Sequence, residues 1–312
     1  MDKIKQSRPL SFVIIALVYA IAIVGGIFIY RALIQHLDFW LSLLIADICA
    51  TIITYIFSVI FNNASVYDPY WSVQPIVIVT AFACIRPMGI VQWLLLVAVW
   101  FWGVRLTANW AYCFGNLTHQ DWRYTHYKEK TGKAYQLANF FGIHLVPTLI
   151  VYGCVLPAVF AFEYWAEITA NAGSYIFFIV SIGAAVLQMI ADIQMQSYRK
   201  SKKGGLIRVG LWKHSRHPNY LGEILMWWGV GFAVLCVMPE RWWLLAGALA
   251  NTLMFLFISI PLAEGRQSKK PTWAEYKSQT RMLLPIPRFS KKKAVAEVVE
   301  DNADTTEAEN QQ

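Results

Sequence analysis

Residues 10–30 read LSFVIIALVYAIAIVGGIFIY, an apolar stretch without a single charged side chain. A helix needs about 20 such residues to cross the ~30 Å hydrocarbon core of a bilayer. Similar stretches recur along the chain, and together they predict an all-α, polytopic transmembrane helical bundle. The seven clear stretches are residues 10–30, 39–61, 89–110, 141–162, 174–191, 220–238 and 242–262.

The composition excludes an ordinary soluble domain. Of the 312 residues, 57% are hydrophobic and 15% charged, which is more apolar and less charged than soluble domains are. The net charge of +8 comes from Lys and Arg beside the apolar stretches rather than from a separate basic domain, so nucleic acid is not an expected partner. Five cysteines stand singly without metal-ligand spacing, and the histidines form no helical ligand pair, so no metal site is predicted.

An eighth apolar segment, residues 73–85, is short and has Pro75 near its start. It could cross the membrane by recruiting its flanks, or it could be re-entrant. Lys and Arg accumulate in short cytoplasmic loops, and eight spans would place the basic loops at 123–133 and 199–216 on one side with both termini. Seven spans would put the termini on opposite sides. The charge pattern therefore favours eight spans with cytoplasmic ends.

One helical face of the span that ends near Arg199 carries polar residues. Gln188, Asp192 and Arg199 stand at positions i, i+4 and i+11, which share that face. An ionisable group at membrane depth is costly and usually faces a bundle interior or a wet cavity, so Asp192 is a functional candidate. The alternative is that Asp192 and Arg199 lie solvated at the cytoplasmic rim.

The densest polar stretch is GLWKHSRHPNYLGE at residues 210–223. Pro218 suits the first turn of a helix, and Asn219 and Glu223 would then share one face. Free backbone N–H groups and Arg216 could bind a phosphate there, which predicts an anionic ligand. The alternative is a basic loop that contacts lipid head groups, although this would not explain a buried Glu223.

The run SRHPNYLGE at 215–223, followed by Trp227, Trp228 and Gly229, resembles the C-terminal domain of steroid 5α-reductases. Upstream, DPYW at 68–71, RL at 105–106 and DWRY at 121–124 resemble the bacterial DUF1295 branch. The resemblance covers about residues 60–290. Further matching positions downstream are Pro261, Glu264, Arg266, Tyr276, Arg281 and the LPIP sequence at 284–287.

The resemblance implies an NADPH-dependent reductase of a carbon–carbon double bond conjugated to a ketone. The expected partners are membrane lipids and a lipophilic substrate, which would reach a pocket among apolar helices most easily from the bilayer. Asp68, or Tyr67 beside it, would lie near the position of the family's carbonyl-polarising Glu. Glu223 would lie beside the nicotinamide end of the cofactor. Asp68 could equally begin a turn as part of Asp-Pro. The family's second polarising residue, a Tyr, has no counterpart within residues 89–110. The implied cofactor-binding residues are Gln188, Asp192, Arg199, Arg216, His217, Asn219, Tyr220, Glu223, Glu264, Arg266 and Tyr276.

This reading divides the chain into N-terminal transmembrane helices at 1–61, a DUF1295-like transmembrane domain at 62–290 and a charged, disordered tail at 291–312. The bacterial resemblance favours an inner membrane. Two other classes stay open. One is an S-adenosylmethionine-dependent membrane methyltransferase of the isoprenylcysteine type, which resembles the same domain but typically has paired glutamates where this chain has Glu264 and Gly265. The other is a non-enzymatic membrane protein on the same scaffold.

Overall fold

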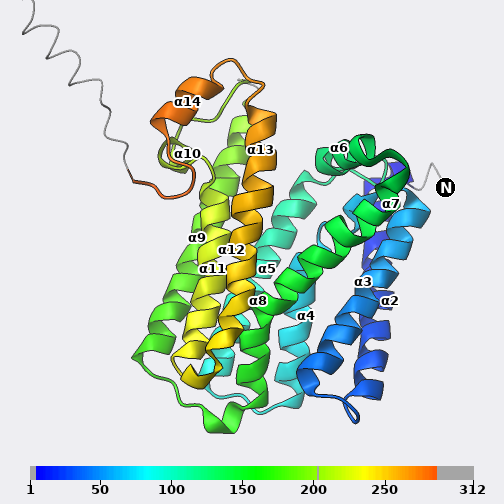
Figure 1. Ribbon diagram of the computed structural model, residues 1–312, viewed down its shortest axis with the longest axis vertical. Helices are drawn as coiled ribbons and strands as arrows, with labels where there is room; N and C mark the ends of the chain where they lie inside the picture. The colour runs from blue at the N-terminus through cyan, green and yellow to red at the C-terminus, as the bar shows by residue number, and fades with distance from the viewer. Residues whose placement is uncertain (1–4, 202–203, 287–312) are drawn as a thin grey trace, which may run out of the picture.

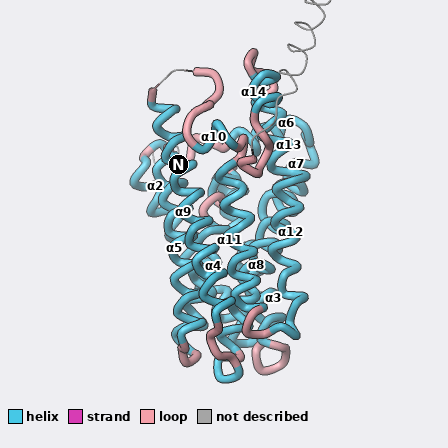
Figure 2. Tube along the Cα trace, turned by 90° about the vertical axis from the view of Figure 1, so that its left-hand side faces the viewer, coloured by secondary structure: helices cyan, strands magenta, loops and turns pink. Residues whose placement is uncertain are grey.

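The computed structural model describes residues 5–201 and 204–286, so the predicted disorder of the tail at 291–312 lies outside the described residues. The described residues form helices and no strand apart from one isolated bridge between Ser215 and Arg281 (Figure 2). The elements that build the bundle are α2 (Arg8–Leu33), α3 (Phe39–Phe61), η1 (Ala64–Val66), α4 (Tyr70–Ile85), α5 (Ile90–Cys113), α6 (Trp122–Thr131), α7 (Tyr135–Leu137), η3 (Ala138–Leu145), α8 (Val146–Glu163), α9 (Ala172–Lys200), α10 (Leu211–His214), α11 (Pro218–Leu235), α12 (Ala246–Met254), η6 (Phe255–Ser259), α13 (Ile260–Gln267) and α14 (Trp273–Gln279).

The long helices run side by side along the bundle axis (Figure 1). Within the described residues, six helical segments are long and apolar enough to cross a membrane. These segments confirm the predicted all-α membrane bundle. Two more helices run along the same axis: α4, whose 16 residues span about 24 Å, and α11, which carries Glu223. Counting them, the chain passes along the bundle eight times, and α2 begins at the same end at which α13 finishes (Figure 1).

The outer surface of the bundle is apolar. Large hydrophobic side chains on the outward faces are well exposed, among them Phe28 (69%), Ile179 (66%) and Phe257 (72%). A soluble monomer rarely exposes apolar surface of this extent, whereas lipid tails cover it at no cost. The exposed face therefore supports the membrane assignment independently of composition.

Helices α9 and α11 pack so closely that only glycine fits at two points of contact. A Cβ added to Gly222 would lie 2.6 Å from the carbonyl oxygen of Ala184, and one added to Gly229 would lie 3.0 Å from that of Phe177. Small residues allow this kind of approach between membrane helices. As a result, the polar face of α9 lies directly against the beginning of α11.

Helices α8 and α12 also touch through glycines. A Cβ on Gly247 would lie 2.0 Å from the carbonyl carbon of Gly153. From this contact α8 and the α12–α13 helix diverge toward the end of the bundle that carries α6 and α14, hereafter the α14 end (Figure 1). Each diverging helix contains a π-helical segment, η3 on one side and η6 on the other. Such segments occur frequently at functional sites.

Candidate active site

The carboxylate of Glu223 is buried and accepts hydrogen bonds from three side chains. The indole nitrogens of Trp102 and Trp227 donate at 2.8 and 2.9 Å. Gln188 Nε2 donates at 2.6 Å. A buried carboxylate needs several hydrogen-bond donors to offset its loss of hydration. Here the donors come from α5, α9 and α11. The network therefore fixes the relative positions of three helices at one point.

A buried ion pair extends this network toward the α14 end. Arg105 Nη1 lies 2.8 Å from Asp192 Oδ2, and Arg105 also donates to Gln188 Oε1. Asn219 Nδ2 donates to the other Asp192 oxygen at 3.4 Å. Among the described residues, the Oδ1 atom of Asn219 is buried without a hydrogen-bond partner. The site thus presents an unsatisfied acceptor, which a ligand with an N–H group could bind.

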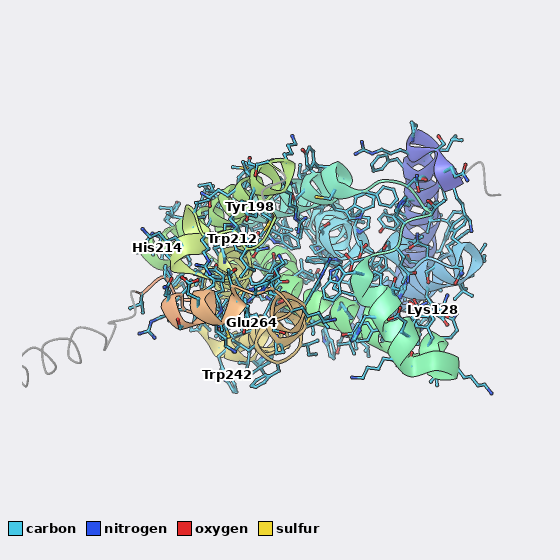
Figure 3. The ribbon with its side chains drawn as sticks, turned by 90° about the horizontal axis from the view of Figure 1, so that it is seen from above. Lys128, Tyr198, Trp212, His214, Trp242 and Glu264 are labelled. Carbon is cyan, nitrogen blue, oxygen red and sulfur yellow. The ribbon has the colours of Figure 1, made fainter. Side chains whose placement is uncertain are left out.

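A cavity of about 880 Å³, here called the polar cavity, opens beyond Asp192 toward the α14 end. Its volume lies within the range of about 300–1,000 Å³ that is usual for ligand pockets. In the view onto this end, Tyr198, Trp212 and Glu264 gather on the side of the bundle opposite Lys128 (Figure 3). Aromatic rings on its wall could pack against a planar ligand; they are Trp122, Tyr198, Trp212, Tyr220, Trp273 and Tyr276.

Besides Arg216, which is paired with Glu264, four cations line the polar cavity: Arg199, Arg266, Lys269 and Lys270. None of them forms an ion pair with any part of the chain that the structure describes. Burial, together with the nearby charges of Arg266 and Arg199, lowers the pKa of Lys270 below its usual value. Positive charges that repel one another around a cavity would be stabilised by a multiply charged anion such as a phosphate.

A second cavity of about 260 Å³, here called the apolar cavity, lies between the diverging helices α8 and α12–α13. Both π-helical segments contribute to its wall, η3 through Gly142 and Ile143 and η6 through Phe255 and Ile258. Ile258 is 50% exposed on the outer surface of the bundle. This cavity is therefore bordered by surface that faces lipid, and it suits a hydrophobic ligand.

The two cavities share part of their walls. Arg266 lies over the ring of Trp122, 4.5 Å from its centroid, and this contact joins α13 to α6 across the boundary. Asp192, Asn219 and Tyr220 separate the polar cavity from the apolar one. The full set of shared residues is Trp122, Asp192, Asn219, Tyr220 and Ala263.

Tyr124 of α6 lines the apolar cavity, and its hydroxyl donates a hydrogen bond to Asp68 Oδ1. Arg123 lies 3.6 Å from the same oxygen. Asp68 itself belongs to the turn before α4, as its Asp-Pro sequence favours. The family's second polarising Tyr was expected within residues 89–110, so Tyr124 was not predicted, although the DWRY motif contains it. Only the fold brings residue 124 next to residue 68.

The Asp68 carboxyl should make stability depend on pH. Burial raises the pKa of Asp68 from 3.8 to about 6, an effect that Arg123 and Tyr124 partly offset. Because the folded state binds the proton more tightly, this contribution to stability is complete below the unfolded pKa and is lost as the pH rises through about 6. It amounts to roughly 3 kcal/mol. Unfolding in detergent at several pH values should show this loss between pH 4 and pH 7 in the wild type but not in Asp68→Asn; parallel curves would contradict the assignment.

The structure places the remaining sequence-predicted residues at three locations. Tyr67 lines the apolar cavity and hydrogen-bonds the hydroxyl of Thr148 at 2.8 Å. Glu264 lies behind the wall of the polar cavity, where it receives hydrogen bonds from Arg216 and His217. The residues that the structure places on the wall of the polar cavity are Asp192, Arg199, Arg216, His217, Asn219, Tyr220, Arg266 and Tyr276.

The C-terminal segment is tied to the beginning of α11 by main-chain and side-chain bonds. The N–H groups of Arg216 and His217 donate to the carbonyl oxygens of Arg281 and Met282 at 2.9 and 3.2 Å. Arg216 also lies 2.7 Å from Glu264, with side chains only 4% and 14% exposed. Arg216 therefore holds the wall of the polar cavity together rather than projecting into it as a free cation.

Fold and site together define a membrane-embedded helical bundle in which a cationic polar cavity adjoins an apolar one. The chain belongs to the DUF1295 family, whose model, described as a protein of unknown function, matches residues 54–280. An uncharacterized protein of Schizosaccharomyces pombe is 28% identical to it over 148 residues. That match covers 40% of this chain, which spans 43% of the yeast protein. No solved structure matches the chain.

Proposed function

We propose that this protein is a membrane-embedded, NADPH-dependent reductase of a conjugated carbon–carbon double bond in a lipophilic substrate. The observation that carries the proposal is the common wall of the two cavities at Asp192, Asn219 and Tyr220. A charged, water-soluble cofactor and an apolar substrate need different surroundings but must meet at one point. This arrangement of cavities provides such a point.

The donors around the polar cavity fit a dinucleotide phosphate. Arg199, Arg266, Lys269 and Lys270 would hold the pyrophosphate and the 2′-phosphate, for which several cations are needed. The unpartnered Oδ1 atom of Asn219 would accept a hydrogen bond from a carboxamide N–H group at the boundary with the apolar cavity. When bound, NADPH supplies the hydride for reduction.

On the substrate side, the Tyr124 hydroxyl is the group that we assign to the substrate carbonyl. Reduction of an enone builds negative charge on that oxygen, and a donor placed there in advance stabilises it. The Tyr124 hydroxyl donates to Asp68, which lies 3.6 Å from Arg123. When Asp68 is protonated, its carboxyl group donates to the Tyr124 oxygen instead, and the phenolic proton is free to bond the substrate carbonyl. Glu223 accepts hydrogen bonds from three donors, and we assign it a positioning role rather than proton transfer. It holds Gln188, which bonds Arg105, and Arg105 in turn pairs with Asp192.

The polar cavity is less suited to a methyl donor. S-adenosylmethionine carries a positively charged sulfonium and no phosphate, so the four cations would oppose its binding. Glu264, the acid in the region where methyltransferases of the related type carry two, is already paired with Arg216 and His217. These features favour the reductase over the methyltransferase.

A thermal-shift experiment in detergent tests the proposal. We expect NADPH to raise the melting temperature, because a ligand at 100 times its Kd stabilises the folded state by about 2.7 kcal/mol. NADH should give a smaller shift, since it lacks the 2′-phosphate. S-adenosylmethionine should give none.

Charge-removing variants locate the binding. Arg266→Gln and Lys270→Gln should each reduce the NADPH shift, because both cations line the polar cavity. Lys128→Gln is the matched control. Lys128 lies on α6, at the same end of the bundle but on the side away from Tyr198, Trp212 and Glu264 (Figure 3). A shift with S-adenosylmethionine alone would favour the methyltransferase, and no shift with any nucleotide would favour a non-enzymatic protein.

A further inference from the structure

A chain of hydroxyl groups leads from the apolar cavity into the N-terminal half of the bundle. It begins at Tyr67, whose hydroxyl lies 2.8 Å from that of Thr148 on α8. The Thr148 hydroxyl lies 3.0 Å from that of Thr51 on α3. The Thr51 side chain in turn lies close enough to the Tyr70 hydroxyl to interact with it. Each of these groups can both donate and accept, so the chain can pass a proton in either direction.

The chain ends at a carboxyl group that neither the family match nor the site above includes. The Tyr70 hydroxyl donates to Asp47 Oδ1 at 2.9 Å, and Gln74 Nε2 donates to Oδ2 at 2.7 Å. Asp47 is 6% exposed and forms no ion pair within the described chain. It lies on α3, before residue 54 where the family match begins. A carboxyl group without a cation inside a membrane bundle is costly, which calls for a function.

We infer that this chain is a proton path between Asp47 and the apolar cavity, and that Asp47 stores the proton that completes reduction. The inference rests on the proposed reductase, because reduction of a carbon–carbon double bond consumes one hydride and one proton. Tyr67 releases its hydroxyl proton to the substrate carbon next to the carbonyl. It regains a proton from Thr148, which is replaced in turn through Thr51 and Tyr70. Asp47 ends as the carboxylate.

The same path returns the proton after product leaves. Tyr67 lines the apolar cavity, which shares Asp192, Asn219 and Tyr220 with the polar cavity, and in this scheme water enters across that boundary when the cavity is empty. A proton taken up there passes in the opposite direction and neutralises Asp47. Each turnover therefore takes one proton from water, and the hydroxyl groups end in their starting state.

Infrared spectroscopy of the unliganded protein tests the path without substrate or cofactor. The carbonyl stretch of the Asp47 carboxylic acid is isolated as the difference between the wild-type spectrum and that of Asp47→Asn. After transfer to D₂O, its shift reports exchange of the Asp47 proton with water. We expect Thr148→Val and Thr51→Val each to slow this exchange by at least about tenfold, because each leaves a gap in the chain that costs more than about 1.4 kcal/mol to cross.

Thr54→Val is the matched control. Thr54 is a buried threonine on the same helix, but its hydroxyl bonds the carbonyl oxygen of Ala50 and lies off the chain. Unchanged exchange in both chain variants, or the absence of any acid band that depends on Asp47, would overturn the inference. Because NADPH is not used, slowed exchange in a protein that fails to bind NADPH would support the path and contradict only the reductase.

Discussion

Replacement of Tyr124 by Phe is expected to lower the rate of enone reduction by about 10²–10³-fold, the usual effect of removing one donor to a developing oxyanion. The phenol lines the apolar cavity and is held by Asp68, so its loss removes the hydroxyl and leaves the ring in place. The loss should fall on kcat, because charge on the carbonyl oxygen grows only as the hydride arrives. The measurement is NADPH oxidation by the purified protein with a long-chain α,β-unsaturated ketone in mixed micelles.

Two further variants help to interpret the Tyr124→Phe result. Tyr175→Phe should retain the wild-type rate, because Tyr175 is exposed at the beginning of α9 and lies outside both cavities. Asp68→Asn should slow the reaction while keeping a hydrogen-bonding partner for Tyr124. NADPH binding should be unchanged in Tyr124→Phe. A wild-type kcat in this variant would show that Tyr124 does not act on the substrate carbonyl.

Replacement of Glu264 by Ala is expected to destabilise the protein by about 3–5 kcal/mol, since it leaves a buried cation without its partner. Arg216 is the cation concerned, and its side chain is 4% exposed. Because Arg216 also connects α11 to the C-terminal segment through Thr280 and Arg281, the wall of the polar cavity should loosen. We therefore expect a lower melting temperature, faster proteolysis between α13 and residue 286, and a smaller NADPH shift.

A second ion pair in the same region provides the control for Glu264. Glu275 pairs with Arg208 at 3.0 Å, but its side chain is 55% exposed. Exposed pairs contribute little to stability, so Glu275→Ala should leave the melting temperature nearly unchanged. Equal effects of the two substitutions would show that Glu264 does not organise the cavity wall.

The helices were largely predictable because a membrane-spanning helix satisfies its own backbone and is marked by a long apolar run. The 73–85 segment shows the limit of this rule. It is part of α4, which begins earlier, at Tyr70, and continues through Pro75. Contacts made by Tyr70 and Gln74 with Asp47 of α3 anchor its beginning, and no local pattern in the sequence reveals those contacts.

The site was predictable where its residues share a helix and not where they come from distant ones. Helical spacing placed Gln188 and Asp192 on one face, and the structure brings both against Arg105. The pairing of Tyr124 with Asp68 joins residues from two separate segments, so the helical periodicity of the sequence does not predict it. The ion pair of Arg216 with Glu264 likewise depends on how the C-terminal segment folds back.

The positions of the two cavities determine the phase from which each reactant would reach the protein. The apolar cavity is bordered by lipid-facing side chains such as Ile258, whereas the polar cavity lies at the end of the bundle. The lipophilic substrate would then enter from the plane of the membrane, and the soluble cofactor would enter from the aqueous phase. Turnover would follow the mole fraction of the hydrophobic compound among the lipids, so dilution by additional vesicles would slow the reaction even at constant total amounts.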